Sequence, residues 1–441
     1  MKVKETDIMV FNQNNMSSSL FSRHIVLSLI ILSSCSSYRE TKSDILQIDF
    51  HKAEKRKFIN ASEVISNIEY VALETYSQCL IGESVKISVS ENFILLFSGY
   101  DCFLFSRNGK FIRRIGQKGS GPAEYRDYTY RVKIDEKSGM VYLMSSSEIY
   151  AYSISGEFVK KLNLNELRNT VDISRPLPNI THWKENLFCA NIDLNPGKEP
   201  YRCIIFTLDG EVVKLFPNYI IFNYDFKGIF STNYNREANI YCYNEQLFFR
   251  EILCDTLFRI TDQLEFMPEI VFELPGKKIP INKRGQFAEI LSDNTIQPKN
   301  TPDYVIHYLY EVDKYLFLTG KELCLYNKNS KKIISFEPDP FLQKEITVTI
   351  NNSTVSRTTN LSGFRNDIDG GLPFSPSTSI HIQNNHQMAC VYQSYLLKEL
   401  LTEEHFARYE VKDQEAHKRL RSLLANLDEE DNPVIMIATF K

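Results

Sequence analysis

One stretch of the chain, FSRNGKF at residues 105–111, returns as YSISGEF at residues 152–158 and as FTLDGEV at residues 206–212. Each copy begins with an aromatic residue, has glycine at its fifth place and ends on an apolar residue. Glycine readily adopts the positive φ of a tight hairpin turn, and the flanking apolar residues point the two strands toward the same face. Each copy therefore predicts a β-hairpin.

Two weaker copies begin at Phe258 and Tyr326, and the first residues of successive copies are 47, 54, 52 and 68 residues apart. This spacing is close to the period of a four-stranded propeller blade. The last step is lengthened by an insertion that contains PGKKIPINKRGQ, residues 275–286. Further short strands are predicted at 92–97, 140–144, 186–190 and 315–318. Five hairpins and a sixth unit from about residue 362 predict an all-β, six-bladed β-propeller.

The sixth unit includes a segment with helical spacing, which predicts a helical insertion over about residues 394–427. We interpret it as decoration of the last blade, with a partner-binding helix as the alternative. Residues 434–438 then form a closing strand. Residues 67–73 are left over at the other end of the chain, and we expect them to pair into the last blade, because a closed ring has no exposed edge. The leucines that define the two apolar helix faces are Leu396, Leu397, Leu400 and Leu401, then Leu420, Leu423, Leu424 and Leu427.

Several further strings carry a resemblance to a known family. They are Leu73-Glu74 with Leu80-Ile81-Gly82, IGQKGSGPAEY at 115–125, FRNDIDGG at 364–371, and Asn432-Pro433-Val434 leading to Phe440-Lys441. With these strings the chain resembles the six-bladed β-propeller lipoproteins of Bacteroides-type bacteria, which have a TolB-like propeller fold. The resemblance covers essentially all of the chain after its N-terminal segment. It implies the fold, and it implies no specific activity.

The N-terminal segment predicts export and a lipid anchor. An apolar run follows Arg23 and His24, is too short to span a bilayer, and ends in LSSC at residues 32–35, which resembles a lipoprotein cleavage box. We therefore expect a signal peptide at 1–34, with Met16 as an alternative start, and acylation of Cys35. Residues 35–62 would form a tether and residues 63–441 the propeller. The alternative is an ordinary cysteine after an ordinary signal peptide.

This segment also predicts the location, namely an outer-membrane lipoprotein of the cell envelope that faces the periplasm. The formal net charge of −4 argues against a nucleic-acid partner.

The other eight cysteines are scattered without a CxxC pair, and we interpret most as small buried apolar residues, with disulfides as the alternative. No HExxH or GxSxG motif is present. We predict no metal, no cofactor and no catalytic residue.

Two segments supply candidate ligand-binding residues. The glycine-containing loop from Gly116 to Tyr125 lacks the ending of a phosphate-binding loop, so we expect a crossing from one blade to the next. Such crossings help to line the ligand face of a propeller. The alternative is a purely structural loop. The candidates in and beside this loop are Lys118, Glu124, Tyr125 and Arg126.

The second segment is FRNDIDGG. If it is a strand, Arg365, Asp367 and Asp369 share one face, where two carboxylates could bind a cation or exchange protons. The alternative is that the aspartates cap turns and pair with Arg365.

Separately, Asp-Thr-Leu at residues 255–257 matches a short O-glycosylation sequon of Bacteroides-type bacteria, which makes Thr256 a candidate for modification.

The predicted scaffold lacks a recognisable catalytic set, which favours a non-catalytic module that binds a ligand or an envelope protein. The alternative is a glycan lyase or hydrolase that uses the central propeller face, where paired carboxylates could act. A third hypothesis is a structural subunit of an outer-membrane complex. The predicted partners are thus the membrane, through the lipid, and a glycan or an envelope protein.

Overall fold

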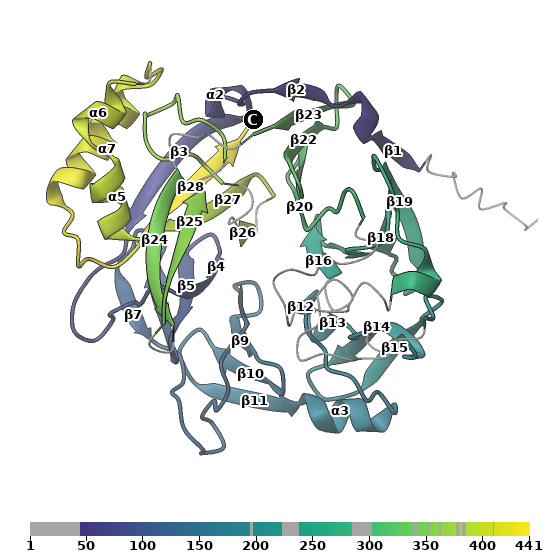
Figure 1. Cartoon of the computed structure of the whole chain (residues 1–441). Helices are drawn as coiled ribbons and strands as arrows, with labels where there is room; N and C mark the ends of the chain where they lie inside the picture. Colours follow the sequence, from purple (N-terminus) through teal and green to yellow (C-terminus); the bar gives the residue numbers. More distant parts are fainter. Residues whose placement is uncertain are drawn as a thin grey trace, which may run out of the picture. The chain divides into compact units, whose positions relative to one another are not determined.

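In the computed structural model, six β-sheets stand around a central axis as the blades of a propeller (Figure 1). The structure describes residues 45–194, 197–222, 238–284, 302–337, 343–350, 353–360, 363–375, 380–381, 385–408 and 410–441. In each of the first five blades the four strands follow one another along the chain, and the first strand is the innermost. The six-bladed, all-β prediction is confirmed.

The strands of these blades have the following bounds. They are β4 (Val85–Val89), β5 (Phe93–Ser98), β6 (Asp101–Ser106) and β7 (Phe111–Arg114); β8 (Arg131–Asp135), β9 (Met140–Met144), β10 (Glu148–Ser153) and β11 (Phe158–Asn163); β12 (Ile180–His182), β13 (Leu187–Asn191), β14 (Tyr201–Thr207) and β15 (Val212–Pro217); β16 (Ala238–Tyr243), β17 (Gln246–Glu251), β18 (Thr256–Ile260) and β19 (Phe266–Glu273); and β20 (Tyr308–Glu311), β21 (Tyr315–Thr319), β22 (Leu323–Asn327) and β23 (Lys332–Phe336). A short helix, α3 (Leu164–Thr170), joins the second blade to the third.

The repeated motif forms the hairpin between the third and fourth strands of a blade. Gly109, Gly156 and Gly210 have φ values of 87°, 89° and 84°. The fourth copy turns two residues later than its aromatic start predicts, because Leu264, with φ 59°, takes the glycine's place. Its amide donates to the carbonyl oxygen of Thr261 at 2.9 Å, as the Gly109 amide does to that of Ser106 at 2.9 Å.

The sixth blade joins the two ends of the propeller. It consists of β26 (Ile380–His381), β27 (Gln387–Tyr392), β28 (Val434–Phe440) and β3 (Ile65–Ala72). β3 pairs antiparallel with β28, from Ala72 opposite Val434 to Ile65 opposite Phe440. The predicted closure by residues 67–73 is therefore confirmed.

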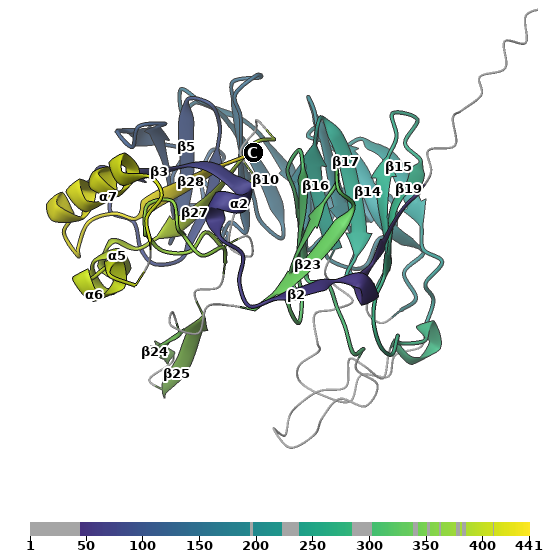
Figure 2. The ribbon, with the colours of Figure 1, turned by 90° about the horizontal axis from the view of Figure 1, so that it is seen from above.

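The N-terminal segment is more ordered than the predicted tether. β1 (Leu46–Asp49) pairs parallel with β19, and β2 (Glu54–Arg56) pairs parallel with β23. Figure 2 shows this segment running past the outer strands of two blades toward β3. A tether from residue 35 to 62 is thus wrong from residue 46 onward, because outer strands carry unpaired backbone groups that a passing segment can satisfy. Cys35 and the predicted signal peptide lie outside the described residues.

The predicted helical insertion lies between β27 and β28. It contains α5 (Ser394–Leu400), α6 (Glu403–Phe406) and α7 (Gln414–Asn426), and the buried Leu397 and Leu420 belong to the same apolar cluster as Ile68 of β3. The helices therefore decorate the sixth blade. No helix in the part of the chain that the structure describes is long and apolar enough to cross a membrane.

Three further elements lie outside the blades. A short helix, α2 (Ala61–Val64), leads into β3, and a hairpin of β24 (Gln343–Ile350) and β25 (Ser353–Asn360) follows the fifth blade. This hairpin is an insertion that the repeat spacing did not predict. Of the predicted insertion at 275–286, the described part contains a 3-10 turn at Ile281–Lys283.

Most cysteines fill apolar space between the blades. Six of the eight in the described residues are buried and two are half-buried, and all eight are free. The buried ones are Cys79, Cys102, Cys189, Cys203, Cys324 and Cys390. The prediction that most of the cysteines are small buried residues is confirmed for these six.

Gly109 gives a test of the link between the repeated hairpin and ring closure. A Cβ at Gly109 would lie 2.1 Å from the carbonyl oxygen of Ala72 in β3, whereas a Cβ at Gly99, which also has positive φ (62°), would meet nothing within 4 Å. We expect Gly99→Ala to lower the free energy of unfolding by about 1 kcal/mol through backbone strain alone. Gly109→Ala should cost roughly 2 kcal/mol more, since the closing strand must shift. Urea unfolding measures both variants, and equal losses would contradict this account of closure.

Candidate functional site

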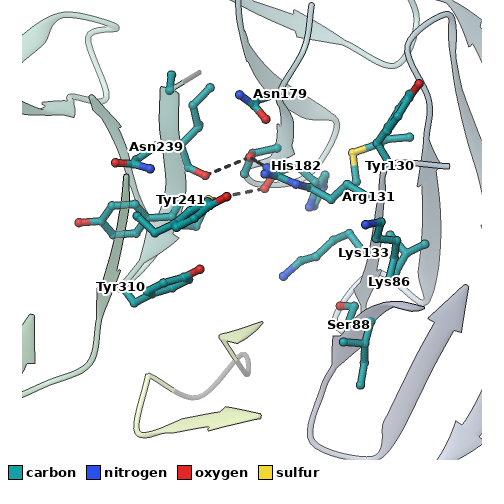
Figure 3. Close-up of a pocket in the computed structure, with 18 of the residues that line it drawn as sticks. Lys86, Ser88, Tyr130, Arg131, Lys133, Asn179, His182, Asn239, Tyr241 and Tyr310 are labelled. Carbon is teal, nitrogen blue, oxygen red and sulfur yellow. Dashed lines mark hydrogen bonds between the residues drawn. The ribbon is translucent and has the colours of Figure 1, made fainter. Parts of the chain in front are cut away.

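The first strands of five blades line a central pocket of about 490 Å³ (Figure 3). Apart from Met144 of β9 and Ile252 after β17, its lining residues come from β4, β8, β12, β16 and β20 and from the residues just before these strands. Short inner strands carry side chains alternately toward and away from the axis. The polar and aromatic lining residues are Lys86, Ser88, Tyr130, Arg131, Lys133, Asn179, Thr181, His182, Asn239, Tyr241, His307, Tyr308 and Tyr310.

The pocket is positively charged. Lys86, Arg131 and Lys133 line it, and no residue that the structure describes in its lining is an aspartate or a glutamate. In a partly enclosed pocket such charges act on a ligand more strongly than they would in bulk water. The arrangement therefore favours an anionic ligand.

Neighbouring blades hold Arg131 in place. Its Nη1 donates to the carbonyl oxygen of Ile180 at 3.0 Å and to Oγ1 of Thr181 at 2.5 Å. The Thr181 hydroxyl in turn donates to the carbonyl oxygen of Ile240 at 3.2 Å. Burial lowers the pKa of Arg131, although a guanidinium stays charged at neutral pH. The result is a fixed cation at the junction of the second, third and fourth blades.

Lys133 is a cation without a counter-ion inside the pocket. Its side chain extends toward the open centre in Figure 3, and its amine makes no hydrogen bond or ion pair with any described residue. Burial lowers the pKa of Lys133. Taking an unpaired ammonium out of water destabilises the protein, and a bound anion would offset that cost.

The two pocket histidines favour the neutral form. Burial lowers the pKa of His182 and of His307, and for His307 the charge of Arg250 acts in the same direction. The Nε2 atom of His182 lies 2.9 Å from the carbonyl oxygen of Glu185, and its ring stacks on Tyr142 with centroids 4.6 Å apart. His182 is thus firmly positioned and contributes little positive charge at neutral pH.

The candidates of the glycine-containing loop lie beside the pocket rather than in it. The loop crosses from β7 to β8, as predicted. Glu124 accepts hydrogen bonds from the Gly121 amide at 2.7 Å and from Nε2 of Gln117 at 2.6 Å, and these bonds lower its pKa. Tyr125 is buried beneath the loop. Both residues stabilise the crossing.

The other two loop candidates also contact their own surroundings. The Lys118 amine lies 3.5 Å from the centroid of the Tyr100 ring, and Nη2 of Arg126 donates to the carbonyl oxygen of Ser120 at 3.2 Å. Neither residue lines the central pocket. Their predicted role in ligand binding stays a prediction.

The Arg365–Asp369 segment is a turn, so the expectation of one shared strand face is wrong. Only a single bridge, between Asn60 and Arg365, pairs the segment with another. The Asp367 carboxylate accepts hydrogen bonds from the Ser62 amide at 2.8 Å and hydroxyl at 2.5 Å, and it lies 2.8 Å from the Lys412 amine. A turn sends alternate side chains in unrelated directions, which separates the two aspartates.

Asp369 is buried near the helical insertion. Its Oδ1 accepts hydrogen bonds from the Gly371 amide, Nδ2 of Asn366 and the Tyr70 hydroxyl at 2.8, 2.7 and 3.2 Å. Its Oδ2 is buried without a hydrogen-bond partner in the structure. The described residues contain no group of three or more His, Cys, Asp or Glu residues that could hold a metal ion. Asp369 thus caps its own turn, as the alternative predicted, whereas Asp367 pairs with Ser62 and Lys412 rather than with Arg365. Neither carboxylate lines the central pocket.

Thr256 is the first residue of β18 and is half-buried. Its hydroxyl donates to Oδ1 of Asp255 at 3.2 Å. Modification of this residue stays a prediction.

The sequence motifs did not single out the cations of the central pocket, although a signal for two of them exists. In the run YRVKI, residues 130–134, Arg131 and Lys133 alternate with the buried Val132 and Ile134. Two basic residues on one face of a blade's first strand therefore point to the axis. Only the assignment of that strand as innermost makes the pattern informative.

Comparisons with known proteins give the fold and a family. A family model described as a domain of unknown function, DUF4934, matches residues 45–439. A Bacteroides fragilis protein that is thought to be exported is 17% identical, with a TM-score of 0.58, over 90% of this chain and 99% of that one. This likeness shows the fold alone.

Other solved structures are more distant. The virginiamycin B lyase of Staphylococcus aureus is 12% identical, with a TM-score of 0.37, over 84% of this chain and 99% of that one. A Bacteroides thetaiotaomicron protein of unknown function is 10% identical, with a TM-score of 0.36, over 84% and 76% of the two chains. None of the curated proteins matches the chain.

Asp369 predicts a measurable pH dependence of stability. Burial, the largest cause, raises its pKa from 3.8 to about 6. Between those values the unfolded chain releases the proton while the folded chain keeps it, so stability falls as pH rises from about 4 to 6 and then levels off. The contribution is roughly 2–3 kcal/mol.

Chemical denaturation of the wild type and of Asp369→Asn from pH 4 to pH 7.5 measures this contribution. The difference between the two free energies of unfolding cancels the other titrating groups. As pH rises from 4, the wild type should lose stability relative to Asp369→Asn. The difference between the two free energies of unfolding should become constant above about pH 6.5. A difference that does not vary with pH would show that Asp369 is ionised in the folded protein at pH 4.

Proposed function

Since the chain belongs to the DUF4934 family, a propeller family of unknown function, we propose from its pocket that the protein is a non-catalytic binding module for an anionic ligand. One observation carries the proposal: the Lys133 amine extends into the central pocket and forms no ion pair with a described residue, the charge of Asp135 acting on its pKa without a direct contact. An evolved fold gains nothing in stability from such a charge. A ligand that neutralises it explains its presence.

The surroundings of Lys133 support the same ligand class. The fixed guanidinium of Arg131 can donate paired hydrogen bonds to a carboxylate or phosphate. Lys86 of the adjacent β4 adds a second amine that has no hydrogen bond or ion pair with the residues described. Three cations from two neighbouring blades thus converge on one pocket.

We further propose that this module resides in the cell envelope. The apolar run and LSSC box before Cys35 support export and lipidation, with Cys35 as the anchor of an outer-membrane lipoprotein that faces the periplasm. Several acyl chains hold a protein on a membrane far more stably than one chain does. The similarity to a protein that is thought to be exported agrees with this location.

Of the alternative, a glycan lyase or hydrolase at the same face, the hydrolase receives less support. A glycoside hydrolase ordinarily uses a pair of carboxyl groups, and the described pocket lining contains neither aspartate nor glutamate. Binding therefore fits the described lining better than hydrolysis does.

Titration with inorganic phosphate and with sulfate, followed by calorimetry at constant ionic strength, tests anion binding. We expect Lys133→Met and Arg131→Gln each to weaken binding about 10- to 100-fold, since each loses a charge-assisted hydrogen bond. Lys332→Met is the matched control, because Lys332 is exposed on the outer strand β23. The proposal is wrong if neither of these anions, nor a carboxylate such as acetate, binds the wild type more tightly than chloride.

Lys133→Met should also have opposite effects on ligand binding and on the stability of the unliganded protein. Because the unliganded protein keeps a desolvated charge at this position, we expect the variant to melt at a higher temperature than the wild type. Added phosphate should raise the melting temperature of the wild type and leave that of the variant unchanged. A variant that melts earlier than the wild type would mean that Lys133 stabilises the fold.

A further inference from the structure

Two exposed tyrosines stand at the pocket on opposite walls. Tyr130 precedes β8 in the second blade and Tyr308 begins β20 in the fifth, and these two blades lie opposite each other in a ring of six. Their side chains are 58% and 50% exposed. Large aromatic side chains left this open at a polar pocket point to a ligand with an apolar face.

Neighbouring rings hold both tyrosines in position. The Tyr130 ring contacts the edge of Tyr128, with centroids 5.7 Å apart and an angle of 75° between the planes. The hydroxyl of Tyr128 lies 3.3 Å from that of Ser84. On the other wall, Tyr308 stacks beside Tyr310 at 6.3 Å and 24°. Both aromatic surfaces are thus preorganised, which lowers the entropy cost of binding.

Uncharged polar groups complete the lining. The Asn179 side chain makes no hydrogen bond with the described residues. Ser88 accepts a hydrogen bond from the Ile134 amide at 3.1 Å, while its own proton has no acceptor among those residues. Asn239 differs, since it donates to the carbonyl oxygen of His307 at 2.9 Å. The pocket therefore offers an amide and a hydroxyl that a ligand rich in hydroxyl groups would satisfy.

We propose that the ligand is a uronic acid unit of an acidic glycan, an inference that rests on the proposed anion-binding function. A pyranose ring has C–H faces that pack on Tyr130 or Tyr308, hydroxyl groups that bond Asn179 and Ser88, and a carboxylate that pairs with Lys133 and Arg131. An aromatic acid could stack and pair in the same way, but it would leave the amide and hydroxyl unsatisfied. The volume of about 490 Å³ lies in the range of small-molecule sites.

Calorimetric titration of the mature chain compares short oligomers of galacturonate and of glucuronate with neutral oligomers of galactose and glucose, and with acetate and phosphate. We expect one acidic oligomer to bind at least about tenfold more tightly than acetate, and its neutral counterpart to bind about tenfold more weakly than the acidic form. If phosphate binds but no uronate oligomer exceeds acetate, the glycan inference fails and anion binding stands. If no anion binds, both fail.

Variants at the two tyrosines test the stacking contribution. Tyr130→Ala and Tyr308→Ala should each weaken binding of the acidic oligomer about tenfold and weaken phosphate binding by a much smaller factor. Tyr130→Phe and Tyr308→Phe keep the ring and should bind like the wild type. Tyr395→Ala, at an exposed ring on α5, is the control. Equal losses of oligomer and phosphate binding in the alanine variants would overturn the stacking assignment.

Discussion

The antiparallel pairing of β3 with β28 is the constraint on which the rest of the structure depends. It joins residues 65–72 to residues 434–440, the two ends of the propeller, into one sheet. Without it the sixth blade would present a free edge and the ring could open. The inner strands keep their spacing around the axis only in a closed ring, so the width of the central pocket depends on a contact at the periphery.

The N-terminal segment adds further strand pairing along the outside of the ring. Before β3 begins, β2 pairs with the outer strand of the fifth blade and β1 with that of the fourth. Parallel edge pairing adds backbone hydrogen bonds without a new core, and it fixes where the chain leaves the propeller. The helical insertion packs against the sixth blade, since Leu397 and Leu420 belong to the same apolar cluster as residues of β3 and β28.

A ring held this firmly can carry a destabilising feature at its centre. Lys133 forms no ion pair with a described residue, and burial lowers its pKa. Its cost is small beside the apolar burial between six blades, where Phe97, Phe103 and Phe206 are almost fully inaccessible. Polar groups that are costly to bury thus lie in the central pocket, where a ligand could satisfy them.

The sequence by itself determined the blades, because hairpin turns and strand alternation are local properties that Gly109, Gly156 and Gly210 make visible. It also determined the closure by residues 67–73, since a repeat leaves one unpaired strand at each end. It could not determine the pocket, whose cations become neighbours only when separate blades meet at the axis. For the same reason the Asp367 and Asp369 pair looked like a site in the sequence, while in the structure a turn sends the two carboxylates to different partners. Periodicity records which face of a strand a residue occupies, and only the tertiary structure decides what lies opposite that face.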